Sequence, residues 1–289
     1  MFCPRLDHFV RLNQDGSVGK CGHMVNAKGF ESFEELERSE WMKGMLDNIC
    51  NSACQSCNAG LSTKIGSLES RDYARVDNYD VFQTLPLDRV IELDVNGGEP
   101  TASKNYKKVL GELPANTKIV RMNTNGSRMI KEIEDVLKRN IMVIVTMSLD
   151  GIGSVHDYTR WPIKWTDYKK TVDAYKDLQE KYKLLQLDFW TTVSCLNIKN
   201  LPEIINFAKN KNIPHDWSFL DKPSVLNIRY KNKFTIRAKH ISPKEIAVDE
   251  DNDKQLEAFI KRQDMLRDIS IDDYFNLGPA LSRNSSANR

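Results

Sequence analysis

The sequence has no long apolar run. No stretch approaches the roughly 20 residues that a transmembrane helix needs, and Met1-Phe2-Cys3-Pro4-Arg5 lacks the apolar core of a signal peptide. An excess of one charge is also missing, because 42 Lys and Arg oppose 40 Asp and Glu, for a net charge of +2. A nucleic-acid-binding surface usually appears as a basic excess. We therefore expect a cytoplasmic protein with neither a membrane segment nor a nucleic-acid partner.

Cysteine is sparse as well, but it is clustered. Six cysteines occur in 289 residues, and three of them, Cys50, Cys54 and Cys57, follow the spacing C-x3-C-x2-C. In a large chain with no sign of secretion, this clustering indicates metal binding or catalysis rather than disulfides. Three thiolates on one loop can hold three irons of a cubane iron–sulfur cluster and leave the fourth iron open to another ligand. The alternative is a structural zinc ion completed by a distant Cys or His.

Beyond the cysteines, apolar β-branched runs alternate with amphipathic stretches. Strands are expected at 90–95, 118–122, 141–147, 187–193 and 217–220, and helices at 105–113, 129–139, 165–182, 201–210 and 249–267. Such alternation implies parallel strands with right-handed crossovers. Five clear strands are too few for a closed eight-stranded barrel, so an open barrel is expected. The nearly unbroken apolar run 141–147 predicts a strand buried on both faces.

The segment before the cysteines predicts a small separate module. Residues 8–12 and 17–21 are expected to form a β-hairpin around Asp15-Gly16, and Ser32 begins a helical pattern that extends to Asp47. The fold class is therefore α/β: a partial (βα)6 parallel barrel preceded by a β-hairpin-plus-helix module. The expected domains are a hairpin-helix module at 1–47, a core at 48–225, a helical extension at 226–281 and a disordered tail at 282–289.

Polar motifs follow several of the expected strands. Gly97-Gly98-Glu99-Pro100 follows the strand 90–95, and a Gly-Gly pair lets a ligand approach the backbone closely. In barrel folds the carboxyl ends of parallel strands carry the active site. The later motifs are Asn123-Thr124-Asn125-Gly126, Ser148-Leu149-Asp150-Gly151, His156-Asp157-Tyr158-Thr159-Arg160 and Thr191-Thr192-Val193-Ser194. Each motif alone is also compatible with an ordinary strand-to-helix turn.

Taken in order, the cysteine motif and these strand-end motifs resemble the radical S-adenosylmethionine (SAM) superfamily over about residues 48–220. The resemblance implies that Cys50, Cys54 and Cys57 bind a [4Fe-4S] cluster whose fourth iron is chelated by SAM. It also implies a set of SAM contacts. The edge Gly97-Gly98-Glu99 would accept hydrogen bonds from the SAM amino group, and Arg160 would pair with the SAM carboxylate. Asn125 and Ser148 would lie near the ribose or sulfonium, and Ser194 near the adenosine.

The reaction implied by this resemblance begins when the reduced cluster gives one electron to SAM. SAM is then cleaved to methionine and a 5′-deoxyadenosyl radical, which abstracts hydrogen from a substrate. A one-electron reductant such as flavodoxin or ferredoxin is implied as a partner. The substrate is not identified by the sequence. A peptide or protein is favoured over a small molecule, by analogy with superfamily members that carry twitch-like modules.

The first residues resemble the start of such a twitch or SPASM-like module. Cys3-Pro4, the hairpin and Cys21-Gly22-His23 carry this resemblance. No further Cys-x2-Cys precedes Cys50, which argues against a second iron–sulfur cluster and favours two buried, unpaired cysteines at Cys3 and Cys21. The segment 45–49 also makes a poor first barrel strand. The alternative function is therefore a non-catalytic binding protein on a degenerate radical SAM scaffold, and a zinc-stabilised interaction module is a third interpretation.

Overall fold

The computed structural model describes residues 11–12, 18–19, 41–70, 75–84, 87–228 and 252–275. Within these residues, six parallel strands form one sheet in which sequence order is also spatial order. The strands are β3 (Trp41–Met45), β4 (Glu92–Asn96), β5 (Ile119–Thr124), β6 (Met142–Ser148), β7 (Leu185–Val193) and β8 (His215–Phe219). The predicted partial parallel barrel is thereby confirmed.

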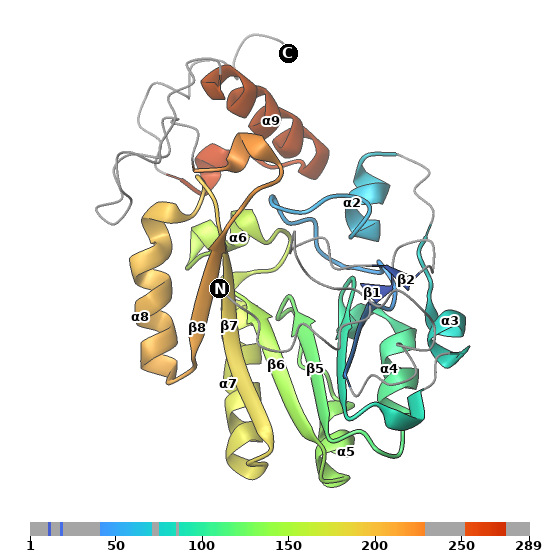
Figure 1. The fold of residues 1–289 in the computed structure, drawn as a ribbon. Helices are drawn as coiled ribbons and strands as arrows, with labels where there is room; N and C mark the ends of the chain where they lie inside the picture. The colour runs from blue at the N-terminus through green and yellow to red at the C-terminus, as the bar shows by residue number, and fades with distance from the viewer. Residues whose placement is uncertain are drawn as a thin grey trace.

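The helices that join the strands lie mainly on one face of the sheet (Figure 1). They are α2 (Thr63–Leu68), α3 (Tyr79–Thr84), α4 (Lys104–Gly111), α5 (Ile133–Lys138), α6 (Ser154–Thr159), α7 (Trp165–Lys181) and α8 (Leu201–Lys211). Because the strand order never reverses, right-handed crossovers place α4, α5, α7 and α8 on the same side. The main core fills the space between those helices and the sheet.

The two faces of the sheet differ in chemistry. Leu93 and Val95 point into the helix-covered core, whereas the alternate residues Glu92 and Asp94 lie on the other face. There they pair with basic residues of the neighbouring strands: Lys43 Nζ lies 2.8 Å from an Asp94 oxygen, and Arg121 pairs with Glu92. The inner face of the open barrel is therefore polar.

The strand β6 departs from its prediction on this inner face. The run 141–147 was expected to be buried on both sides. On the inner face Ile144 is buried, but Met142 and Thr146 are only half-buried. The prediction therefore holds for the outer face and only in part for the inner face, because among the described residues helices cover the outer face of the sheet alone.

Residues 41–45 form the strand β3, which pairs in register with Glu92–Asn96 of β4. The predicted helix 32–47 is therefore wrong from Trp41 onward, and residues 32–40 lie outside the described part. The sequence Trp-Met-Lys-Gly-Met has no β-branched residue and includes Gly44, so its local strand preference is weak. Pairing with β4 decides the conformation instead. The first barrel strand is thus present at Trp41–Met45, just before the segment 45–49 where a first strand was expected to be poor.

Three further elements lie outside the six-stranded sheet and its connecting helices. β1 (Arg11–Leu12) pairs with β2 (Val18–Gly19) in antiparallel register, as expected for the hairpin. The helix α9 (Asn252–Arg267) lies at the end of the sheet where the strands finish (Figure 1). Cys3, Cys21 and the tail 282–289 lie outside the described residues, so the second-cluster and tail predictions stay open.

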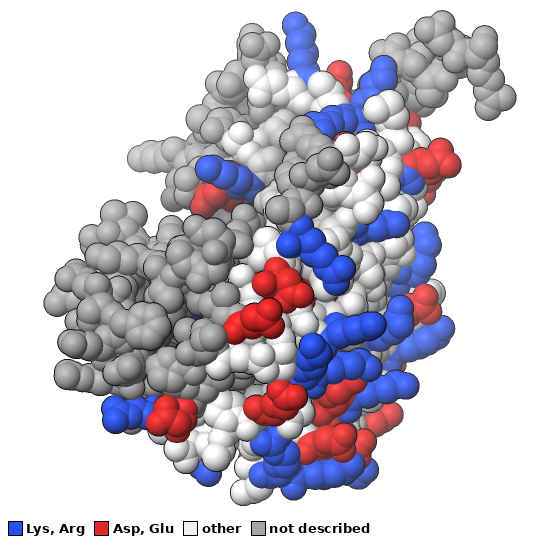
Figure 2. All heavy atoms as spheres, turned by 90° about the vertical axis from the view of Figure 1, so that its right-hand side faces the viewer, with Lys and Arg blue, Asp and Glu red and all other residues white. Residues whose placement is uncertain are grey.

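The described surface carries charges of both signs. Figure 2 shows acidic and basic side chains interspersed over the described part of one face. None of the described helices combines the length and the apolar character that crossing a membrane requires.

Candidate functional site

The cysteine loop, residues 50–57, begins shortly after β3 and runs beside the end of β4. The amide of Gly98 donates to the carbonyl of Asp47 at 2.8 Å, and the amide of Glu99 donates to the carbonyl of Ile49 at 2.7 Å. A Cβ atom on Gly98 would lie 2.0 Å from the Ile49 oxygen, and one on Gly97 would lie 2.3 Å from the Asp47 oxygen. Only glycine fits at both positions. The close approach that the sequence assigned to a ligand is thus made by the chain itself.

Asp47 anchors the start of this segment, although no sequence motif marks it. Its carboxylate accepts hydrogen bonds from the Ile49 amide at 3.0 Å, from the Asn105 side chain at 3.2 Å and from the Ser103 hydroxyl. Ser103 is also the N-cap of α4, where its hydroxyl accepts from the Asn105 amide. Burial raises the pKa of Asp47. The approach to the cysteine loop is therefore fixed to the first turn of α4.

Glu99 is fully buried, and its carboxylate joins the ends of β4 and β5. One oxygen accepts from the Thr101 amide at 3.1 Å, the Thr101 hydroxyl at 2.8 Å and the Thr124 hydroxyl at 2.9 Å. The other accepts from the Asn125 amide at 2.7 Å. Burial raises the pKa of Glu99, and these four donors oppose that shift. Both carboxylate oxygens of Glu99 thus already accept hydrogen bonds. We therefore expect the backbone carbonyls of the edge 97–99 to accept from the SAM amino group.

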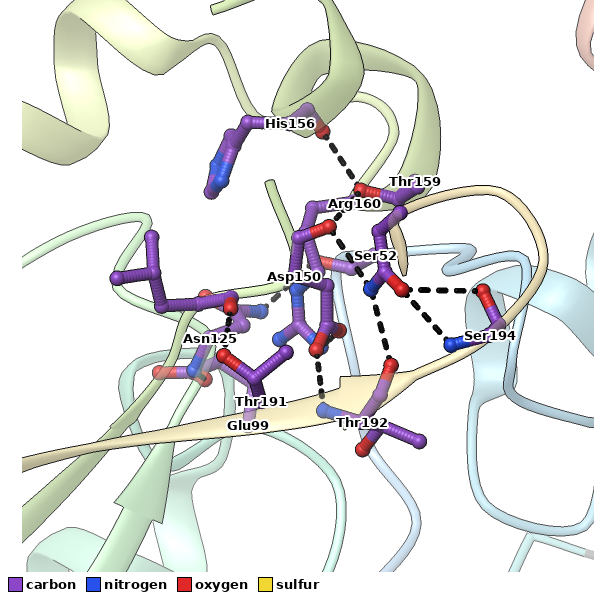
Figure 3. A network of polar contacts seen from close by, with 12 residues as sticks. Ser52, Glu99, Asn125, Asp150, His156, Thr159, Arg160, Thr191, Thr192 and Ser194 are labelled. Carbon is purple, nitrogen blue, oxygen red and sulfur yellow. Dashed lines mark hydrogen bonds and ion pairs between the residues drawn. The ribbon is translucent and has the colours of Figure 1, made fainter. Parts of the chain in front are cut away.

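Asn125 ties the end of β5 to the cysteine loop. Its side-chain nitrogen donates to Asn51 Oδ1 at 2.7 Å and to Ser52 Oγ at 2.8 Å, while its side-chain oxygen accepts from the Ser127 amide at 2.9 Å. Asn51 in turn donates to Ser127 Oγ at 3.0 Å. Ser52, Glu99 and Asn125 accordingly appear in one polar network (Figure 3). The structure thus brings Glu99 and Asn125, both predicted site residues, into contact with the cysteine loop.

Arg160 forms a buried ion pair with Asp150, the acidic residue of the motif that follows β6. Its Nη1 lies 3.0 Å from Asp150 Oδ2, and the other carboxylate oxygen accepts from the Thr192 amide at 2.8 Å (Figure 3). Arg160 Nε is also buried and has no hydrogen-bond partner among the described residues. The guanidinium is therefore held by one carboxylate and retains one donor for another acceptor.

The two predicted serines occupy different settings. Ser148 ends β6, is half-buried and pairs in register with Trp190 on β7. Ser194 is buried in the turn after β7, where its amide donates to Asn197 Oδ1 at 2.7 Å and its hydroxyl accepts from the Leu196 amide at 3.3 Å. Ser194 therefore shapes its own turn, and its predicted contact with adenosine stays a prediction.

The three thiols are strongly desolvated. Burial raises the pKa of Cys54 to about 12 and that of Cys57 to about 11, and it also raises the pKa of Cys50. The positive charge of Arg160 lowers all three pKa values, and the neighbouring thiols raise the pKa values of Cys54 and Cys57. Thiols with raised pKa values are protonated at neutral pH, so a bound metal would have to displace their protons. Neighbouring positive charge favours that exchange.

The donor set fits a thiolate-bound iron–sulfur cluster. Three thiols share one short loop, with Cys54 buried and Cys50 and Cys57 half-buried. The buried, unpartnered Nε of Arg160 offers a donor to an anionic group in their vicinity. In the described part of the chain, no group of three or more Cys, His, Asp or Glu side chains is gathered as the ligands of a single metal ion.

The loop is also held by the residues on either side of Arg160 and by α9, a helix that contains no predicted site residue. The Ala53 amide donates to the Trp161 carbonyl at 2.8 Å, and the Gln55 amide donates to the Thr159 carbonyl at 3.0 Å. From α9, Arg267 donates twice to the Ala53 carbonyl, at 3.0 and 2.8 Å. Sequence reasoning missed Arg267, because no local pattern distinguishes it on a highly charged helix.

Comparison with known proteins gives relatives over part of the chain. No protein-family model matches. Mycofactocin maturase MftC of Mycolicibacterium smegmatis is 30% identical over 132 residues, which are 45% of this chain and 33% of that protein. MftC of Mycobacterium tuberculosis is 29% identical over the same length. The match thus spans a third of the length of these curated relatives.

Solved structures with a similar fold were also found. The crystal structure of Streptococcus suis SuiB bound to S-adenosylmethionine has a TM-score of 0.48 and 12% identity, and the match covers 79% of this chain and 48% of SuiB. The structure titled native anSMEcpe with bound AdoMet and a Kp18Cys peptide has a TM-score of 0.45 and 16% identity, covering 80% of this chain and 62% of that one.

The resemblance to the radical SAM superfamily is confirmed at the level of the superfamily. The twitch or SPASM-like detail, the domain boundaries and the role of each SAM-contacting residue stay predictions.

Proposed function

We propose that this chain is a radical SAM enzyme that uses a [4Fe-4S] cluster on Cys50, Cys54 and Cys57. The observation that carries the proposal is the attachment of the cysteine loop to the strand ends. The side chain of Asn125 donates to Asn51 and Ser52 of the loop, and its backbone amide donates to the Glu99 carboxylate. A loop held in this way would present an open iron toward the mouth of the barrel, where parallel-barrel enzymes place their chemistry.

When bound, the cluster and SAM would supply one-electron reduction and a carbon radical that abstracts hydrogen. The residues of the chain would bind and orient SAM. Arg160 would pair with the carboxylate through Nε while Asp150 holds its Nη1, and carbonyl oxygens of the Gly97-Gly98-Glu99 edge would accept from the amino group. Asn125 and Ser148 would border the ribose or sulfonium, and Ser194 the adenosine. Burial of the thiols would exclude water from the cluster.

The proposed substrate is a peptide or protein. Two facts support this class: the curated relatives are named maturases, and the inner face of the sheet offers paired charged groups such as Lys43 with Asp94 that can hydrogen-bond a polar chain. A one-electron reductant such as flavodoxin or ferredoxin would complete the reaction.

The alternative of a non-catalytic binding protein has lost part of its support. It rested partly on a poor first strand before the cysteines, and β3 now fills that place at Trp41–Met45. The enzyme is therefore the better account of the described residues.

The test is anaerobic reconstitution with iron and sulfide, followed by SAM and dithionite. The wild-type chain should bind about four iron atoms and release 5′-deoxyadenosine, and a variant with Cys50, Cys54 and Cys57 all changed to Ala should do neither. Cys195→Ala is the matched control, since Cys195 is buried but lies outside the loop. A triple variant that still holds a full cluster, or a loaded wild type that yields no 5′-deoxyadenosine, would contradict the proposal.

A further inference from the structure

Arg267 is the last residue of α9, and it reaches into the middle of the cysteine loop. Its side chain is 5% exposed. Nε and Nη2 donate to the Ala53 carbonyl at 3.0 and 2.8 Å, and Nη1 donates to the Gln263 carbonyl at 3.1 Å and to the Gln263 side-chain oxygen. Ala53 directly precedes Cys54. A fork of two hydrogen bonds therefore fixes one carbonyl of the loop from a helix 214 residues away in sequence.

The helix itself is anchored independently of this contact. The Tyr158 hydroxyl donates to Asp264 Oδ1 at 2.8 Å, and Asp264 Oδ2 accepts from the Ile271 amide at 2.8 Å. Leu256 and Ile260 of α9 are buried in a second apolar cluster with Tyr158. A substitution at Arg267 should consequently leave α9 in place, so its effect on the loop can be measured separately.

The two buried guanidinium groups beside the loop differ in their partners. Arg160 is paired with the carboxylate of Asp150. All hydrogen bonds that Arg267 makes within the described residues go to uncharged oxygens, those of Ala53 and Gln263. A buried cation bonded only to neutral groups is costly, and a negative charge placed beside it lowers that cost. The carboxylates of Asp264 and Glu69 already act on Arg267 in this way, and the thiolates of Cys54 and Cys57 would add to them.

We propose that Arg267 is a positioning residue that fixes the cysteine loop through Ala53 and supplies positive charge to a cluster held there. The first part concerns the protein without a cluster. The second part rests on the proposed function. The two parts have separate measurements, so failure of one is distinguishable from failure of the other.

Three full-length variants test this inference. Arg267→Met keeps a long apolar side chain and removes both the hydrogen bonds and the charge, whereas Arg267→Lys keeps the charge and one donor. Arg262→Met is the matched control, because Arg262 lies on the same helix, is half-exposed and bonds to Glu69 at 3.2 Å, away from Ala53.

The cluster-free proteins are compared first, by amide hydrogen exchange. In Arg267→Met, residues 50–57 should exchange faster than in wild type while α9 keeps its protection, and Arg262→Met should match wild type. Unchanged exchange of the loop in Arg267→Met would overturn the positioning role. This result does not depend on whether the chain binds a cluster.

The loaded proteins are then compared by chelator challenge and by the midpoint potential of the cluster. Arg267→Met should lose iron about ten- to a hundred-fold faster than wild type, the range seen when a supporting residue around metal ligands is removed. Its potential should fall, and Arg267→Lys should restore most of the potential. A potential that is equal in all three proteins would overturn the electrostatic role. A wild type that takes up no cluster would instead contradict the proposed function.

Discussion

The side-chain nitrogen of Asn125 lies 2.7 Å from the side-chain oxygen of Asn51, across 74 residues of sequence. The first residue follows β5 and the second follows the first cysteine of the loop. The same nitrogen also donates to Ser52 at 2.8 Å. Because Asn125 directly follows β5, its side-chain amide links the position of the cysteine loop to the position of this strand in the sheet.

Replacing Asn125 with Ala should loosen the loop. The change removes both hydrogen bonds to the loop and leaves Asn51 Oδ1 and Ser52 Oγ with only their long mutual hydrogen bond of 3.4 Å. Such a loss costs about 1–3 kcal/mol. Urea denaturation should show this loss of stability, and the iron content after reconstitution should fall. Asn123→Ala is the control, since exposed Asn123 bonds only to Asn96 within the described residues. Equal iron content in the two variants would contradict the role of the Asn125 side chain in holding the cysteine loop.

Replacing Gly98 with Ala should damage the junction between β4 and residues 47–49. The new Cβ would lie 2.0 Å from the Ile49 carbonyl oxygen, so one of the two backbone segments must move. We expect a loss of about 3 kcal/mol or more in the free energy of unfolding, as for other severe overpacking.

The control for this variant is Gly111→Ala. Gly111 ends α4, and a Cβ atom there meets nothing within 4 Å. Alanine should therefore stabilise the helix slightly, by up to about 1 kcal/mol. If the two alanine variants unfold at the same denaturant concentration, the close backbone contact is not as described.

Buried His156 should make stability depend on pH. Its ring packs against Tyr168 and Trp165 with centroids 4.6 and 5.4 Å away, and burial, aided by the charge of Arg160, lowers its pKa to about 3. The neutral form is favoured in the folded state. The stability that depends on neutral His156 is therefore complete above pH 6.5 and is lost as the pH falls toward 3. At pH 5 the loss should be about 2 kcal/mol.

His156→Phe should reduce this acid sensitivity, because phenylalanine fits an aromatic site and cannot take up a proton. Chemical denaturation of the cluster-free protein at pH 7 and pH 5 measures the difference. His215→Phe should change the pH dependence much less, since His215 is only half-buried. An acid sensitivity that persists unchanged in His156→Phe would show that another group is responsible.

Breaking the Asp150–Arg160 pair should be costly. Asp150→Asn leaves a buried guanidinium without its carboxylate, and the expected loss is about 3–5 kcal/mol. The surface pair of Lys138 with Asp135 supplies the control: Asp135→Asn should change the stability much less, because this pair is exposed to solvent. Thermal unfolding of the cluster-free variants distinguishes the two outcomes, and similar melting temperatures would refute the difference in burial between the two pairs.

The sheet was predictable wherever a strand had its own apolar pattern. Runs such as 118–122 and 187–193 are β-branched or aromatic, and the structure has strands at Ile119–Thr124 and Leu185–Val193. β3 was missed because Trp41–Met45 has no β-branched residue, a single aromatic one and a glycine, so its conformation is set by pairing with β4 more than by local preference.

The site was predictable only where residues followed strand ends in a familiar order. Cys50, Glu99 and Asn125 do so, and the structure joins their segments. The partners that hold them are set by distant contacts: Asp47 bonds across to Ser103, and Arg267 reaches Ala53 from the last described helix. No local pattern encodes such pairs. Similarly, the Gly97-Gly98 pair predicted that another group lies close to the backbone, but it did not show that this group is the backbone of residues 47–49.

The long interval between Ala53 and Arg267 has a consequence for how the protein is made. A ribosome releases the cysteine loop and the whole sheet well before it adds the residue that secures the loop from α9. Until then the loop lacks the two hydrogen bonds that Arg267 donates to Ala53, which leaves the nascent chain a period in which iron and sulfide can be delivered to a less restrained loop. Folding of α9 would then supply those bonds.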